Sequence, residues 1–239
     1  MRKIFLNSSK ASRHKQPGLK AVNDLSGWPS FLLLLIGKLI GGNMMSVLSV
    51  GFIGEGVHRS KKKGKHTPEY AAWRKMLIRC YDHKYHKTRP SYEGCFVCED
   101  WHRFQVFADW YKENYYQVAN ERMELDKDIL VKGNKIYAPE RCVFVPQRIN
   151  GLLNRHTMGR GEYPIGVRLG EREKRFLARC HDIDGSLVRI GRFDTPEEAF
   201  SHYKAFKEKV IKSVAEQYRA VIPDSLCKAL YNYKVEIDD

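Results

Sequence analysis

The sequence predicts an α+β protein with two different kinds of strand-and-helix unit. Aromatic residues recur at helical spacing between residues 67 and 114, which predicts packed helices. Residues 123–154 alternate like two strands separated by a turn and then become helical, which predicts a ββα unit. Residues 163–211 hold three short strand-like runs and one capped helix, which predicts a three-stranded antiparallel sheet packed on a helix.

The composition points to a polyanionic partner. The 239 residues include 42 Lys and Arg against 28 Asp and Glu, which gives a formal charge of +14. A hydrophobic fraction of 43% is that of a globular protein and excludes a disordered chain. Nucleic acid is the first candidate partner for this charge, an anionic membrane surface is the second, and no small-molecule substrate is predicted.

The six cysteines predict reduced thiols, because a chain of this length can bury a core without a disulfide scaffold. Only Cys95 and Cys98 have the spacing of a metal-binding pair. A closed zinc site usually needs a second pair or two well-placed histidines. The favoured interpretation is therefore thiols packed in the core of a cytoplasmic protein.

The first 44 residues differ from the rest of the chain. Residues 31–54 are apolar apart from Lys38, and their length is close to the roughly 20 residues of a membrane span. Three interpretations stay open: a translation start at Met44 or Met45 that makes the upstream segment non-native, a membrane or signal segment, and a genuine soluble extension. The first is favoured, because codons for Gly-Gly-Asn before two methionines are compatible with a bacterial ribosome-binding site.

A basic segment follows at residues 45–66. Five of the eight residues from 58 to 65 (HRSKKKGK) are cationic. The segment is either a solvated linker or a flexible arm that contacts phosphates with salt-sensitive affinity. In the second interpretation the DNA-binding side chains are those of Lys61, Lys62 and Lys63.

Two helices are predicted next. Thr67 and Pro68 have the residue types of an N-cap and a first helical position. A second helix is expected from about Glu99 to Asn114, with an aromatic residue at every third position. Both aromatic stripes are typical of a buried core rather than of a binding platform. The histidines in this region do not by themselves indicate a catalytic role.

The predicted ββα unit carries clustered carboxylates. Asp126 and Asp128 lie at the end of its first strand, and Gly133-Asn134 marks the turn. Arg141 to Val145 is the expected second strand, and the residues from Gln147 onward become helical. Carboxylates beside a basic surface favour a divalent cation site.

The segment from about Tyr70 to Asn154 resembles the phage-encoded HNH homing endonucleases. The resemblance lies in WRKMLIRCY, YEGCFVCEDWHRFQVFADW, LDKDIL and GNKIYAPERCVFVP. It implies a ββα unit that binds one divalent metal, Mg²⁺ or Mn²⁺, and hydrolyses a phosphodiester. In that family a histidine at the end of the first strand activates water, a loop asparagine orients the histidine, and a histidine or asparagine on the helix ligates the metal.

The resemblance implies a role for each matching position. Asp126 takes the place of the acidic metal ligand, and Asn134 takes that of the loop asparagine. Asn150 takes the place of the helix ligand, with Asn154 as the weaker alternative.

The chain departs from the family at the catalytic position. Lys127 stands where the histidine is expected. A charged lysine neither coordinates metal nor accepts a proton, since its pKa is ordinarily near 10.4. Asp128, the next residue, is the candidate base in its place.

The residues from 163 onward predict a DNA-binding sheet. In the runs IGVRL, RFLARCH and LVRIG, apolar residues alternate with arginine, so one face can pack on the helix while the other presents guanidinium groups. Arginine reads guanine edges in the major groove. The candidate DNA-binding arginines are Arg168, Arg175, Arg179 and Arg189.

This segment also resembles AP2 DNA-binding domains. The shared features are Gly166-Val167-Arg168, Phe176-x-Ala178, Gly191-x-Phe193 and the DTPEEA run that begins at Asp194. The resemblance implies a three-stranded sheet that lies in the major groove of double-stranded DNA and is backed by one helix. Phe176 and Arg189 stand where the family has tryptophans, so its base preference does not carry over.

The predicted organisation has five parts: an upstream segment (1–44), a basic linker or arm (45–66), an HNH-like domain (67–156), an AP2-like domain (163–212) and a C-terminal helical tail (213–239). The predicted function is metal-dependent DNA cleavage by a phage HNH-type endonuclease in the cytoplasm of a bacterial host, targeted by the sheet. The alternative is a catalytically degenerate descendant that binds specific DNA sequences, and Lys127 is the residue that divides the two.

Overall fold

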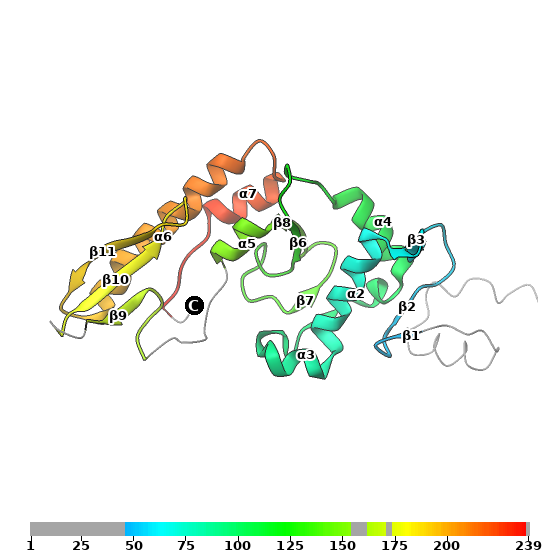
Figure 1. The fold of residues 1–239 in the computed structure, drawn as a ribbon, viewed down its shortest axis with the longest axis horizontal. Helices are drawn as coiled ribbons and strands as arrows, with labels where there is room; N and C mark the ends of the chain where they lie inside the picture. Colours follow the sequence, from blue (N-terminus) through cyan, green and yellow to red (C-terminus); the bar gives the residue numbers. More distant parts are fainter. Residues whose placement is uncertain (1–45, 154–161, 171–173, 238–239) are drawn as a thin grey trace, which may run out of the picture. The chain divides into compact units, whose positions relative to one another are not determined.

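The computed structural model describes residues 46–153, 162–170 and 174–237, and it has the mixed α+β character that the sequence predicts (Figure 1). The expected upstream segment, 1–44, and the alternative ligand Asn154 lie outside the described residues. None of the described helices combines the length and the apolar character that are needed to cross a bilayer.

The segment expected to be a linker or a flexible arm contains two small hairpins. Strands β1 (Ser46–Val47) and β2 (Gly51–Phe52) pair with each other, as do β3 (Lys61–Lys62) and β4 (Lys65–His66). The segment expected as a linker or arm therefore contains regular strands, and a two-residue turn closes the second hairpin.

The aromatic helices form the first core. Helix α2 (Pro68–Tyr81) begins as predicted, with the Thr67 hydroxyl accepting a hydrogen bond from the backbone of Tyr70. The expected helix from Glu99 is divided into a 3-10 turn, η2 (Glu99–His102), and α4 (Phe104–Asn114). Between α2 and η2 lie α3 (His83–Thr88) and a second 3-10 turn, η1 (Pro90–Tyr92). The fully buried aromatic residues of this core are Trp73, Trp101, Phe104 and Phe107, with Tyr137 from the ββα unit.

The ββα unit follows the predicted order. Strand β6 (Met123–Asp126) pairs antiparallel with β8 (Val143–Pro146), and α5 (Gln147–Leu153) packs against both strands. The connection between β6 and β8 contains β7 (Ile136–Tyr137), which pairs in parallel with β5 (Phe96–Val97). Through this second pairing the unit is joined to the aromatic helices.

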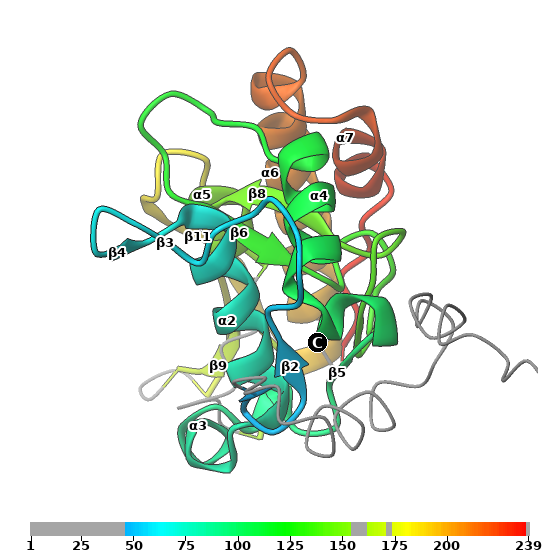
Figure 2. The ribbon, with the colours of Figure 1, turned by 90° about the vertical axis from the view of Figure 1, so that its right-hand side faces the viewer.

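The last sheet has three antiparallel strands in the order β11-β10-β9. Its strands are β9 (Val167–Leu169), β10 (Phe176–His181) and β11 (Leu187–Phe193). Helix α6 (Pro196–Tyr218) packs against all three strands, and the Thr195 hydroxyl caps its first turn. Figure 1 shows α6 along the sheet, and Figures 1 and 2 show α7 (Asp224–Tyr231) beside α6.

The C-terminal segment belongs to the second core. Leu226 and Leu230 of α7 are fully buried, in a cluster that also contains Val145 of β8 and Ile149 of α5. The residues predicted as a helical tail therefore contribute apolar packing to the ββα unit as well as to α6.

Gly166, just before β9, provides a test of how the sheet packs on α6. Its φ angle is +77°, and a Cβ atom there would lie 2.1 Å from the ring of Tyr203 on α6. Gly185 has a φ angle of +86° but open space around it. We expect Gly185→Ala to cost about 1 kcal/mol of unfolding free energy from backbone strain alone. Gly166→Ala should cost about 3 kcal/mol, because overlap is added to strain. Equal losses in urea titrations of the two variants would contradict this packing.

Candidate nucleic-acid interface and the ββα site

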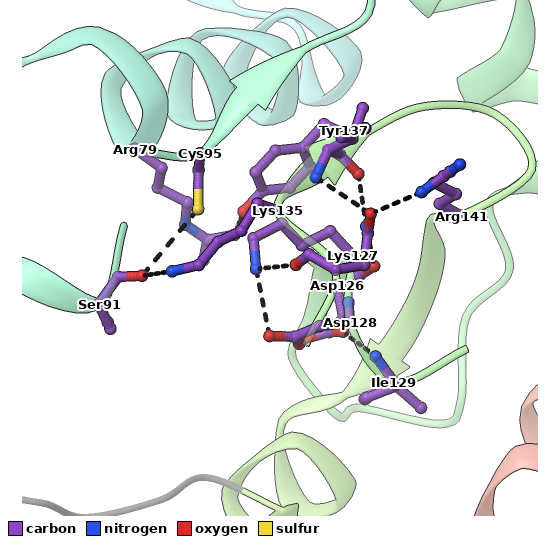
Figure 3. A network of polar contacts seen from close by, with 12 residues as sticks. Arg79, Ser91, Cys95, Asp126, Lys127, Asp128, Ile129, Lys135, Tyr137 and Arg141 are labelled. Atoms are coloured by element: carbon purple, nitrogen blue, oxygen red, sulfur yellow. Dashed lines mark hydrogen bonds and ion pairs between the residues drawn. The ribbon is translucent and has the colours of Figure 1, made fainter. Parts of the chain in front are cut away.

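The Asp126 carboxylate, at the end of β6, caps the turn that follows. Its Oδ1 atom accepts hydrogen bonds from the backbone N–H groups of Asp128 and Ile129, both at 2.9 Å (Figure 3). Burial, together with the charge of Asp128, raises the pKa of Asp126 to about 7. One oxygen of this carboxylate is therefore already occupied by hydrogen bonds within its own turn.

Lys127 is buried and forms two hydrogen bonds through its ammonium group. Nζ donates to Oδ2 of Asp128 at 3.1 Å and to the backbone oxygen of Asn134 at 3.0 Å (Figure 3). Burial by itself lowers the pKa of Lys127, but Asp128, Cys95 and Asp126 together outweigh it, and the pKa lies above its usual value. Lys127 is therefore a charged donor that holds the turn, and Asp128, the candidate base, has one oxygen engaged by it.

Asn134 ties the loop back to residue 127. Its Nδ2 atom donates to the backbone oxygens of Lys127 at 2.6 Å and of Ile136 at 2.7 Å. Its Oδ1 atom accepts from the guanidinium of Arg141 at 3.0 Å. Asn134 is buried, and a buried amide without hydrogen-bond partners would cost folding free energy. These bonds supply the partners. The backbone at position 127 is thus held by the residue to which the family resemblance gives an orienting role.

The described residues supply few ligands for a divalent metal. Asp126 and Asn150, which is half-buried on α5, supply only one carboxylate and one neutral amide. Lys127 places an ammonium charge beside the two acidic residues. Within the described ranges, no group of three His, Cys, Asp or Glu side chains is arranged to hold a metal ion. All six cysteines are free thiols, as expected, and most are buried.

A buried carboxylate two residues before Asp126 anchors β6 to the helical core. Glu124 contacts Lys75 at 2.6 Å, Arg79 at 3.1 Å and Arg122 at 2.9 Å. Arg79 also donates to the backbone oxygen of Leu125 at 3.0 Å. The sequence signal for this cluster is a pair of cations four residues apart on the apolar side of α2, and the sequence-based reasoning missed it.

Replacement of Glu124 tests this anchor. Burial by itself raises the pKa of Glu124, but the hydrogen bond from Lys75 and the other cations lower it below the ordinary 4.5. Its stabilising contribution is therefore complete above pH 4.5 and is lost as the pH falls through the folded pKa. Glu124→Gln should cost about 3–5 kcal/mol at pH 7, because it leaves buried Arg79 without its carboxylate. The effect of the substitution should shrink below pH 4.5 in urea titrations across pH.

Glu140→Gln is the matched control for that titration. The Glu140 side chain is 68% exposed and its pair with Arg141 is a surface pair, so the substitution should cost about 0.5 kcal/mol or less. If both variants were destabilised by the same free energy at every pH, Glu124 would not be the anchor.

Three arginines gather on the sheet face opposite α6. Arg179 on β10 stands directly opposite Arg189 on β11 and diagonal to Arg168 on β9. Burial together with the charges of Arg168 and Arg189 lowers the pKa of Arg179, which marks the three groups as electrostatic neighbours. In the described part of the chain no carboxylate pairs with any of the three.

Arg175 does not belong to this cluster. It precedes β10, and its Nε atom pairs with Oδ1 of Asp194 at 2.9 Å. The expected strand RFLARCH, which grouped Arg175 with Arg179 by alternation, begins one residue before the observed strand. Its role in DNA binding stays a prediction, since this ion pair is an exposed surface pair.

A β-bulge brings a fourth arginine to the same face. The register passes from Ala178–Gly191 to Arg179–Arg189, so Ile190 is an extra residue in β11 and faces the core. Arg192 therefore shares a face with Arg189 although the two are three residues apart. Strict alternation assigns Arg192 to the helix side, which is why sequence reasoning missed it.

Lys61, Lys62 and Lys63 are exposed on and beside the β3–β4 hairpin.

Comparison of the chain with protein-family models, with curated proteins and with solved structures finds no match.

Proposed function

We propose that the protein binds double-stranded DNA through the arginine face, defined as Arg168, Arg179, Arg189 and Arg192 on β9, β10 and β11. The observation that carries the proposal is the gathering of Arg168, Arg179 and Arg189 with no carboxylate partner among the described residues. Like charges held together repel one another, and a polyanion relieves that repulsion. The formal charge of +14 supports the same partner.

The layout of this face suits the major groove. A small antiparallel sheet fits a groove about 12 Å wide, and arginine can donate two hydrogen bonds to O6 and N7 of guanine. Leu177 lies opposite both Arg168 and Arg192 in the register and is buried, which indicates that the arginine stems pack over it. Such packing restricts the arginine side chains before DNA binds, so each loses less conformational entropy on binding.

The second candidate function is DNA cleavage by the HNH-like ββα unit. The bond from Asn134 to the backbone of residue 127 favours it, since the family's loop asparagine has the same orienting role. Lys127 opposes it, because an ammonium with a raised pKa accepts no proton from water. A degenerate nuclease that retains sequence-directed DNA binding is therefore the function that the site supports best.

Substitution of the arginine face tests DNA binding. Replacing Arg168, Arg179 and Arg189 with Ala should leave the fold intact and weaken duplex binding by about 1–3 kcal/mol for each base that is no longer recognised. A matched variant that replaces the exposed residues Lys84, Lys87 and Lys112 with Ala removes the same charge from the helices. Fluorescence anisotropy at fixed salt measures both. Equal weakening in the two variants would mean that the face has no special role.

Restoring the family's residue tests cleavage. With Mg²⁺ or Mn²⁺ the natural protein should show at best slow nicking of supercoiled DNA, and Lys127→His should nick faster, because a neutral imidazole can accept a proton from water. Asp126→Ala should abolish nicking in either background, and EDTA should do the same. Efficient cleavage by the natural protein that survives Lys127→Ala would assign the base role to another residue. No cleavage by Lys127→His, with DNA binding intact, would leave sequence-directed DNA binding without catalysis as the function.

A further inference from the structure

Residues 59–66 form a basic β-hairpin whose shape is fixed by its turn. Lys62 and Lys65 are directly paired across the two strands, and Lys63 and Gly64 complete the turn with φ angles of +50° and +77°. Positive φ at both central residues is the requirement of a type I′ turn, which matches the twist of the strands it joins. Figure 2 shows the hairpin extending to one side of α2.

The hairpin is attached to the helical core at its C-terminal end. Thr67, the N-cap of α2, donates from its backbone to the oxygen of Ser60 at 3.1 Å and from its hydroxyl to that of Arg59 at 3.0 Å. The ring of His66 stacks on Tyr70 of α2, with 4.8 Å between the ring centroids. The strands are therefore continuous with the start of a buried helix.

The entering strand is held by α4. His58 is buried, and its backbone exchanges two hydrogen bonds with the side chain of Gln105, at 2.9 and 3.0 Å. Its ring contacts the Asp109 carboxylate at 2.6 Å. Gly56 lies so close to Gln105 that a Cβ atom would be 2.2 Å from the amide oxygen. The base of the hairpin cannot swing freely like a linker.

The charges on the hairpin have no acidic partners among the described residues. The sequence has no Asp or Glu between Glu55 and Glu69. Within the described ranges, no ion pair involves a residue from 59 to 66. Like charges directly opposite in an antiparallel pair are destabilising, and the pairing of Lys62 with Lys65 has this arrangement. The hairpin retains this repulsion, which a polyanion would remove.

We propose that the hairpin is a preformed β-ribbon that grips the phosphate backbone of duplex DNA as a second contact, separate from the arginine face. This inference rests on the proposed DNA-binding function and adds a rigid, sequence-independent clamp to it. A two-stranded ribbon fits within a DNA groove, and lysines along its edges reach phosphates. Because the turn fixes the ribbon beforehand, little conformational entropy is lost on binding.

Charge removal gives the first test. Deletion of residues 58–65 would also remove buried His58, so we choose Lys61, Lys62, Lys63 and Lys65 replaced together by Gln. Binding to a fluorescent 30-base-pair duplex should weaken about tenfold at roughly 0.15 M KCl for all sequences alike. The slope of log K against log salt should fall by about 0.9 for each phosphate that the variant no longer neutralises. The charge-matched control replaces the exposed Lys112, Lys209, Lys212 and Lys228 with Gln.

Turn disruption gives the second test. Gly64→Val keeps every cation, and a Cβ atom at this position would meet no neighbouring atom within 4 Å, but a β-branched residue disfavours a φ angle of +77°. Its affinity for the duplex should fall about threefold, with the protein still folded at the assay temperature. Full affinity of Gly64→Val would overturn the preformed ribbon.

The outcomes separate this proposal from the proposed function. If the hairpin variant and its control weaken binding equally while the arginine variant loses binding, the clamp is wrong and the proposed function stands. If the hairpin variant loses binding while the arginine variant keeps it, the clamp stands and the arginine face is wrong. Binding of phosphatidylserine vesicles by the natural protein, without binding of the duplex, would overturn both.

Discussion

The buried Glu124 carboxylate is the group on which the position of the ββα unit depends. It lies on β6 and is held by Lys75 and Arg79 of α2 and by Arg122. Arg79 adds a bond to the backbone of β6 itself. Three cations around one carboxylate offset a burial cost that a single pair would not overcome. The turn that carries Asp126 and Lys127 starts from this fixed strand.

The sequence predicted the fold class and most of its elements, because local signals there were strong. Thr67-Pro68 and Thr195-Pro196 marked two helix starts, and alternation identified the three strands of the last sheet. The hairpin at residues 61–66 was not predicted, because two-residue strands are too short to show a periodic pattern and a run of lysines is typical of a solvated chain. Its signal was Lys63-Gly64, a turn pair between short runs.

The candidate site was predictable in its residues but not in its contacts. Alternation placed Arg168, Arg179 and Arg189 on one face, yet it could not foresee the bulge that adds Arg192. It could not show that Asp194 compensates Arg175 either, since that pair joins segments 19 residues apart. The engagement of Lys127 by Asp128 and Asn134 depends on the shape of a loop, which no periodic pattern encodes.

The bulge at Ile190 gives β11 a spare residue that its neighbours lack. Because Ile190 has no partner on β10, its deletion would leave Arg189 opposite Arg179 and Arg192 opposite Leu177, in a regular ladder. The same arginines would still share one face, but the strand would lose the extra twist that a bulge imposes. The presence of this one residue therefore sets the curvature of the surface rather than its chemistry. Gain or loss of a single codon is a route by which descendants of this chain could adapt the sheet to a differently shaped partner.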